Sequence, residues 1–193
     1  TNVTAYYDWV IDTIGKKLSL TYNYFDRRST SFSTITTTSN AENLYMTNFG
    51  NNNYRISSFK LDWIIPLSLF TLETGASYTG IDNRSFVDIE EFVNDSQAQS
   101  VVGKNTFNYA EDTGAAYISF FGNINAQLYA KLGLRYEYTS VKGNQVENAM
   151  RHSSSYGHLF PTLNVSYNFS NGDFLSASYN IGISKPRFSD LNP

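Results

Sequence analysis

An alternation of apolar and other residues with a period of two is the feature that most constrains this fold. Over residues 126–139, every second position is Ala, Leu or Tyr, and the positions between them are mostly polar. Successive side chains of a β-strand point to opposite faces, so the pattern predicts a strand with one apolar face. A strand of this length spans about 45 Å, or roughly 30 Å when tilted, which is the thickness of a bilayer's hydrocarbon core.

The same alternation recurs along the chain, and strands in soluble proteins are usually shorter. It predicts an all-β fold, an antiparallel up-and-down meander of about eight long strands that form part of a transmembrane β-barrel. The predicted strands cover residues 1–12, 17–26, 54–65, 69–80, 107–121, 125–140, 158–169 and 173–185.

The connections between these predicted strands alternate in length. Tight turns rich in Gly, Asn and Pro are expected at 14–16, 66–68, 122–124 and 170–172, and long polar connections at 27–53, 81–106 and 141–157. One helical turn is expected around residues 88–93. Short turns at one end and long loops at the other are typical of outer-membrane barrels.

Composition favours a membrane barrel over a soluble one. Charged residues make up 16% of the chain, whereas soluble domains usually have about 25%. The 15 Tyr and 14 Phe include many near predicted strand ends, where amphipathic rings suit the headgroup layer. A soluble barrel or sandwich whose Tyr-rich rows fill a core is the less favoured alternative.

The predicted strand at 125–140 supplies the candidate site residues. Lys131, Arg135 and Glu137 share its polar face, where they either line a lumen and contact a polar solute or form a salt-bridge ladder, the alternative we favour. Gly133 on that face suggests close approach by another segment. The opposite face and the last strand supply the candidate lipid-facing residues, which are Leu128, Leu132, Leu134, Leu175 and Ile181.

No catalytic, cofactor-binding or metal-binding residues are predicted, and an enzyme is the least supported class. The two histidines, His152 and His158, lack the spacing of a metal pair, and the chain has no Cys. An acidic stretch lacks the regular spacing of a calcium loop, so a solvated charge cluster is the favoured interpretation. Its members are Asp82, Asp88, Glu90, Glu91 and Asp95. The net charge of −3 gives no indication of nucleic-acid binding.

Several segments together resemble the barrel portion of TonB-dependent outer-membrane receptors of the Bacteroidetes type. They read GLRYEYT at 133–139, LFPTLNVSY at 159–167, LSASY at 175–179 and KPRFSDLNP at 185–193, and an earlier hairpin at 56–78 is similar. The resemblance covers residues 54–193. It departs from the family at Ile181 and Gly182, where arginines are frequent, so no role of those arginines carries over.

The resemblance implies a wall segment of an energy-coupled transporter for a large or scarce solute in the outer membrane of a Gram-negative bacterium. The implied partners are outer-membrane lipid, further strands and a plug of the full-length receptor, TonB, and an unidentified ligand. Such barrels have about 22 strands, so we expect residues 1–193 to be a partial barrel domain. The residues at 1–12 and 173–185 would then be the two edges of an open sheet.

The alternative is a complete eight-stranded barrel with a structural or adhesion role. A barrel that narrow is filled by its own side chains. The inward row of the last predicted strand is small and polar, with Ser176, Ser178 and Asn180, and would leave it underfilled.

Overall fold

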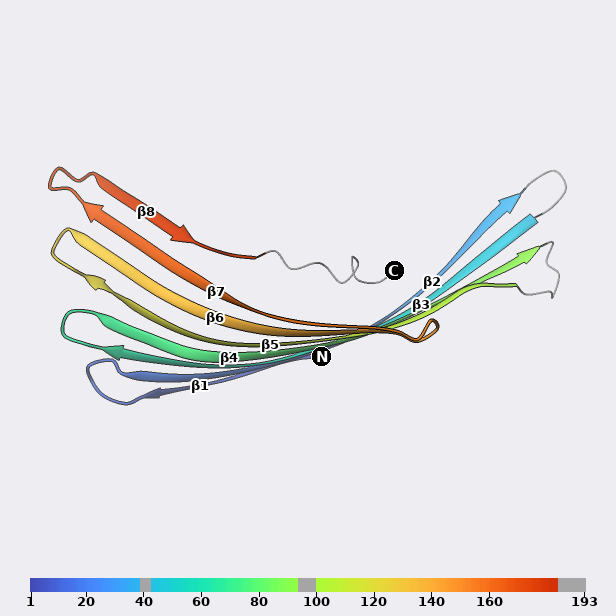
Figure 1. The fold of residues 1–193 in the computed structure, drawn as a ribbon, viewed down its shortest axis with the longest axis horizontal. Coiled ribbons are helices and arrows are strands. Elements are labelled where there is room, and N and C mark those ends of the chain that lie inside the picture. Colours follow the sequence, from blue (N-terminus) through green and yellow to red (C-terminus); the bar gives the residue numbers. More distant parts are fainter. Residues whose placement is uncertain (39–42, 94–99, 184–193) are drawn as a thin grey trace.

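The computed structural model describes residues 1–38, 43–93 and 100–183, and this part of the chain consists of strands and turns. Eight strands form one antiparallel sheet in chain order (Figure 1). They are β1 (Asn2–Val10), β2 (Lys17–Thr38), β3 (Asn43–Pro66), β4 (Thr71–Val93), β5 (Ser100–Asn123), β6 (Leu128–Gln145), β7 (Met150–Asn168) and β8 (Phe174–Asn180). The predicted all-β meander is confirmed. In the described part of the chain, no helix is long and apolar enough to cross a membrane.

The sheet is open and curved. Each strand pairs with its neighbours in sequence, and among the described residues β1 pairs with β2 alone and β8 with β7 alone. The two edges therefore fall where the sequence analysis expects them. Figure 1 shows the strands sweeping through one continuous curve, with β1 and β8 on opposite sides of it.

The strands are much longer than predicted. Each of β2 to β5 has between 22 and 24 residues, so the long connections predicted at 27–53, 81–106 and 141–157 are wrong. Most of those residues continue the ladder, as in the pair Thr34 and Thr47. Most of their side chains are polar, and the apolar ones, such as Phe32 and Ile35, do not alternate regularly. Hydrophobic alternation therefore does not reveal these parts of the strands, which are extended by backbone pairing.

Two local predictions are also corrected. The helical turn expected around 88–93 is strand, because this stretch of β4 pairs with residues 44–49 of β3. The last strand ends at Asn180, so the predicted extension to 185 is wrong for residues 181–183, and residues 184–185 lie outside the described ranges.

The short turns lie together at one end of the sheet. The turns that follow β1, β3, β5 and β7 are together at the left in Figure 1, as predicted, and the connection from β6 to β7 is at the opposite end of those two strands. In the first turn, Asp12 Oδ1 accepts the backbone N–H of Ile14, Gly15 and Lys16 at 2.9–3.0 Å. These bonds, that of Lys16 first, hold the pKa of the Asp12 carboxyl below its ordinary value.

The two faces of the sheet differ in chemistry and in crowding. Cross-strand partners point to the same face, so the register defines an apolar face that contains Leu132 and a polar face that contains Lys131. Most of the best-buried side chains lie on the polar face: Asn83, Phe107, Tyr109, Ala115, Ser119 and Thr139. Large side chains of the apolar face are about half exposed, for example Trp63 and Tyr138.

Some aromatic residues lie near strand ends, as expected, for example Trp9 in β1 and Tyr167 in β7, and others lie in the middle of the strands. Tyr22, Phe59, Tyr78 and Tyr138 form one row across the apolar face, yet β2, β3, β4 and β6 all continue beyond it. The row therefore marks where the apolar surface ends rather than where the strands end.

Replacing the turn glycines should destabilise the sheet. Gly15 and Gly172 have φ of 104° and 91°, a region that costs other residues about 1–2 kcal/mol. We expect Gly15→Ala and Gly172→Ala to lower the free energy of unfolding by about 1 kcal/mol each, measured by urea unfolding in lipid vesicles. Gly114→Ala is the control, because Gly114 lies in β5 with open space around it. Equal losses at all three positions would contradict the assigned turn geometry.

Candidate functional site

A cluster of charged side chains occupies the polar face near the middle of the sheet. β3 contributes Lys60 and Asp62, β4 contributes Glu73, and β6 contributes Lys131, Arg135 and Glu137. The ladder brings them together, because Asp62, Gly75, Tyr117 and Arg135 are successive partners in one cross-strand row. Three cations and three carboxylates make the cluster neutral.

The charges are paired within the cluster. Arg135 Nε lies 2.6 Å from Glu137 Oε1, and Lys60 Nζ lies 2.8 Å from Asp62 Oδ2. Lys131 Nζ is 3.5 Å from Glu73 Oε2, which joins β6 to β4 across β5. The guanidinium of Arg135 also donates to Ser77 Oγ at 3.4 Å.

Tyr117 connects two strands that are not neighbours. From β5 it reaches across β4, and its hydroxyl donates to Asp62 Oδ1 on β3. The ring passes over Gly75, where a Cβ would lie 2.7 Å from Tyr117 Cε1 and 2.3 Å from the carbonyl oxygen of Leu61. Gly75 is therefore required because no side chain fits beneath the tyrosine.

The structure places all three predicted polar residues of β6 in this cluster. Sequence reasoning missed their partners Asp62, Glu73 and Tyr117. Asp62 and Glu73 are more than 50 residues away along the chain, and Tyr117 lies on the neighbouring strand β5. The isolated Gly75 in a strand pattern was the available signal. The expected close approach at Gly133 is present, because a Cβ there would lie 2.9 Å from Ser119 Oγ.

The predicted apolar residues of β6 share the opposite face. Leu132 pairs with Leu163 and Leu134 with Pro161, while Leu128 pairs with Tyr167, which in turn pairs with Leu175. Leu132 and Leu175 are 60% and 63% exposed, which is high for leucines in a folded protein. Ile181 follows the end of β8 and is also exposed.

The cluster suits non-covalent contact with a polar solute or a protein surface. A groove of about 350 Å³ runs along it, lined by Lys60, Glu73, Tyr117, Lys131 and Arg135 among others. Among the described residues, no group of three or more His, Asp or Glu could hold a metal ion. His158 packs edge-on against Tyr156, with ring centroids 5.4 Å apart.

The acidic stretch lies along β4, where the backbone is extended rather than looped. Asp82, Asp88, Glu90 and Glu91 belong to this strand, and Asp95 lies outside the described residues.

Comparison with known proteins identifies the family. The family model described as "Outer membrane protein beta-barrel family" matches residues 9–193. The chain belongs to this family. It is accordingly an outer-membrane β-barrel protein of a Gram-negative bacterium.

Solved structures of outer-membrane receptors share the fold. The ferric citrate transporter FecA, in its unliganded form, matches with a TM-score of 0.62 and 16% identity over 92% of this chain and 26% of FecA. The chain thus spans about a quarter of that transporter's length. No curated protein matches.

Two further receptors match with lower TM-scores. The ferric yersiniabactin uptake receptor FyuA from Yersinia pestis gives 0.42, with 11% identity over 88% of this chain and 26% of FyuA. The alcaligin outer-membrane receptor FauA from Bordetella pertussis gives 0.45, with 15% identity over 93% of this chain and 34% of FauA.

The ion pair between β4 and β6 should show as a coupling energy. Lys131→Glu and Glu73→Lys are each expected to lower the free energy of unfolding, and the double swap should recover about 0.5–1 kcal/mol. The mismatched double variant, Lys131→Glu with Glu137→Lys, should recover nothing because it breaks two pairs. Equal recovery of the free energy of unfolding in both double variants would exclude a specific ion pair between Lys131 and Glu73.

Proposed function

We propose that this chain is part of the wall of a TonB-dependent outer-membrane transporter, with its apolar face toward lipid and its polar face toward the lumen. The observation that carries the proposal is the division of one continuous sheet into a half-exposed apolar face and a crowded, ion-paired polar face. Contact with lipid stabilises the apolar face, and a hydrated or plugged barrel interior suits the polar face.

The height of the apolar band supports a membrane-spanning wall. On β6 the band runs from Leu128 to Tyr138, which is about 33 Å along the strand and about 23–25 Å along the membrane normal at a tilt near 45°. Outer-membrane barrels have an outward apolar band about 25 Å tall with aromatic girdles. The row of Tyr22, Phe59, Tyr78 and Tyr138 provides one such girdle.

The open edges support a partial barrel. Unpaired backbone N–H and C=O groups cost several kcal/mol each in lipid, so β1 and β8 need partner strands. The chain spans about a quarter of FecA, which leaves room for those strands and for a plug. In this proposal residues 1–193 are one sector of the barrel domain, and the charged cluster lines the lumen around the plug.

The transported solute is large or scarce, since energy coupling through TonB serves solutes that cannot enter by diffusion through an open pore. FecA carries ferric citrate by its name, and the fold alone is shared at this identity. The polar face offers ion-paired and hydroxyl groups for positioning a solute or plug.

Charge placed on the apolar face should be far more costly than the same charge on the polar face. Leu132→Arg is expected to lower the free energy of unfolding in lipid vesicles by about 2–4 kcal/mol. The matched control is Asn164→Arg, because Asn164 pairs with Lys131 on the polar face at nearly the same height. Its expected cost is below about 1 kcal/mol. A larger loss of stability with Asn164→Arg than with Leu132→Arg would contradict the proposed orientation.

Transport by a plugged barrel is testable on the full-length protein. Purified protein should bind the periplasmic domain of TonB, and in planar bilayers it should stay closed until its plug domain is deleted, when a large conductance appears. A small complete barrel would show neither property. Failure of both measurements would reject the transporter and favour the eight-stranded alternative.

A further inference from the structure

A patch of aromatic side chains lies on the apolar-face side of the sheet, far beyond the aromatic girdle. It occupies the loop-end parts of β2, β3 and β4, which continue after β6 and β7 have ended at their connecting turn. Cross-strand pairing places Phe32 beside Phe49 and Tyr45 beside Phe92, and the rings of Phe49 and Phe86 meet edge-on with centroids 6.2 Å apart. We call these five residues the outer patch.

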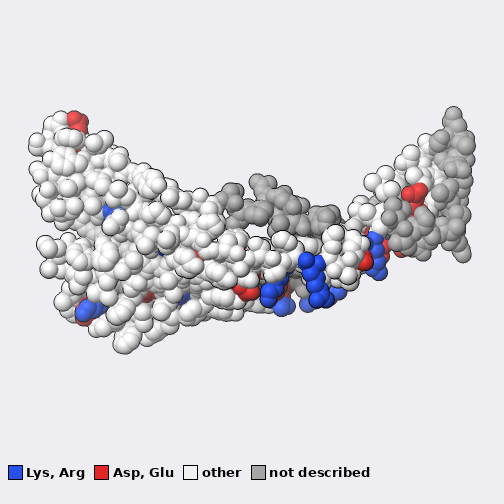
Figure 2. Space-filling view, in the orientation of Figure 1, with Lys and Arg blue, Asp and Glu red and all other residues white. Residues whose placement is uncertain are grey.

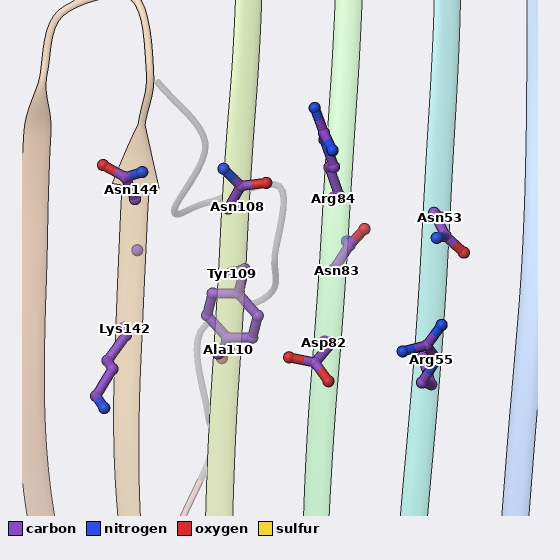
Figure 3. Close-up of a pocket in the computed structure, with 11 residues that line it drawn as sticks. Asn53, Arg55, Asp82, Asn83, Arg84, Asn108, Tyr109, Ala110, Lys142 and Asn144 are labelled. Atoms are coloured by element: carbon purple, nitrogen blue, oxygen red, sulfur yellow. The ribbon is translucent and has the colours of Figure 1, made fainter.

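A polar belt separates the outer patch from the lipid-facing band. Figure 3 shows four residues of this belt side by side on neighbouring strands: Asn144, Asn108, Arg84 and Asn53. Figure 2 shows Lys and Arg side chains gathered along the lower middle of the molecule, between a broad surface at the left that is almost free of charge and the extended strands at the right. The outer patch is therefore not a continuation of the band that contacts lipid.

The outer patch lies above the headgroup layer in the proposed orientation. Phe49 follows the girdle residue Phe59 by ten positions on β3, which is about 33 Å along the strand and about 23 Å along the membrane normal at a tilt near 45°. The headgroup layer adds only about 5–8 Å on each side of the hydrocarbon core. Water, rather than lipid, surrounds these rings in a single copy of the protein.

The rings of the outer patch are not covered by the described part of the chain. Phe32 is 70% exposed and Phe49 is 41% exposed, and β2 carries no charged residue from Ser29 to Thr38. Clustered apolar side chains that remain in water mark a site of interaction with another macromolecule.

Two opposite charges flank the outer patch. Asp88 on β4 and Lys104 on β5 are cross-strand partners, yet within the described ranges neither takes part in a salt bridge. Lys104 Nζ lies 5.3 Å from the centroid of the Phe86 ring instead, an arrangement that cation–π attraction stabilises. A surface that carries rings, a carboxylate and an ammonium group side by side is complementary in charge to a second copy of itself.

We propose that the outer patch binds a second copy of this protein in the same membrane, through a two-fold contact in which Lys104 of each copy meets Asp88 of the other. Two copies inserted in one membrane present the patch at the same height and tilt, so docking restricts only lateral approach and rotation about the membrane normal. A two-fold axis along the normal then brings like patch onto like patch. This inference rests on the proposed orientation of the sheet, which turns the patch away from the lumen.

The size of the patch fits weak association that depends on protein density. Each outward strand position covers about 33 Å², so residues 30–36 of β2 and the facing parts of β3, β4 and β5 cover about 450 Å² per copy. A total of about 900 Å² lies in the range of transient interfaces. Confinement to one membrane raises the effective concentration, so we expect pairs in the membrane rather than in dilute detergent.

The test measures how copies of the full-length protein associate in a membrane. Protein labelled with donor or acceptor dyes at Asn171→Cys, in a background without other cysteines, is reconstituted into phosphatidylcholine vesicles, and energy transfer is recorded as the protein-to-lipid ratio rises. The patch variant is Phe32→Thr/Phe49→Thr. The matched control is Ile35→Thr/Met46→Thr, because Ile35 and Met46 are cross-strand partners on the opposite face of the same two strands.

We expect the patch variant to need at least about tenfold more protein per lipid than wild type for half-maximal energy transfer, and the control to stay within about twofold. Unlabelled wild type should compete with the transfer, and the unlabelled patch variant should not. Equal association by the patch variant and wild type, or equal losses in the patch variant and the control, would overturn the proposal. So would a different protein that co-purifies with wild type and is lost from the patch variant while the association of copies is unchanged.

The two flanking charges give an independent test of the two-fold contact. Lys104→Glu and Asp88→Lys should each weaken self-association about threefold, because each variant places like charges opposite one another. A mixture with the donor on one variant and the acceptor on the other should regain transfer close to that of wild type, because both contacts then pair opposite charges. No gain in the mixture over either variant alone would overturn the two-fold contact.

A single substitution keeps the proposal testable if the patch variant does not fold. Phe32→Thr should weaken self-association about threefold, because Phe32 is the most exposed ring of the outer patch, and no change would overturn the proposal. Unchanged association together with a large cost of Leu132→Arg would reject this inference and leave the proposed orientation intact. A negligible cost of Leu132→Arg would reject the orientation, and this inference with it.

Discussion

The backbone hydrogen-bond ladder is the constraint on which the rest of this structure depends. In a hydrocarbon environment every N–H and C=O must find a partner within the protein. Antiparallel neighbours from β1 to β8 satisfy this except along the edge strands β1 and β8 and along the parts of β2 and β7 that extend beyond them. Pairing, rather than a buried apolar core, therefore holds the sheet together. Among the described residues, the best-buried side chains include Thr139 and Asn83 as well as Phe107.

The register of the strands brings residues that are far apart in the sequence into common cross-strand rows. On the polar face it brings Asp62, Tyr117 and Arg135 together, and Gly75 leaves the space that the tyrosine needs. On the other face it orders an apolar band, an aromatic girdle and then a polar row that contains Arg28, Arg84 and Arg151, each at the same height on successive strands. A shift of one residue between any two strands would exchange the faces, so these rows are coupled to one another.

Hydrophobic alternation was sufficient to predict the strands inside the apolar band, including the opposite facing of Leu132 and Lys131. It failed where the side chains are mostly polar and do not alternate, as around Thr34 and Thr47, because backbone pairing does not require a hydropathy pattern in the side chains. The sequence alone also could not predict the partners within the charged cluster, because the contact between Lys131 and Glu73 depends on register across an intervening strand. Gly133 and Gly75 mark that packing in the sequence, and the sequence analysis predicts a close approach at Gly133 alone.

The central claim is that the two faces of β6 meet different surroundings, lipid on one side and an aqueous or protein-filled lumen on the other. Because the chain contains no cysteine, single spin labels can be introduced at Leu132→Cys, Gly133→Cys, Leu134→Cys and Arg135→Cys in the full-length protein in lipid vesicles. The account predicts that collision with oxygen, which concentrates in lipid, is high at 132 and 134 and low at 133 and 135. Equal oxygen accessibility at all four positions, or the opposite alternation, would contradict it.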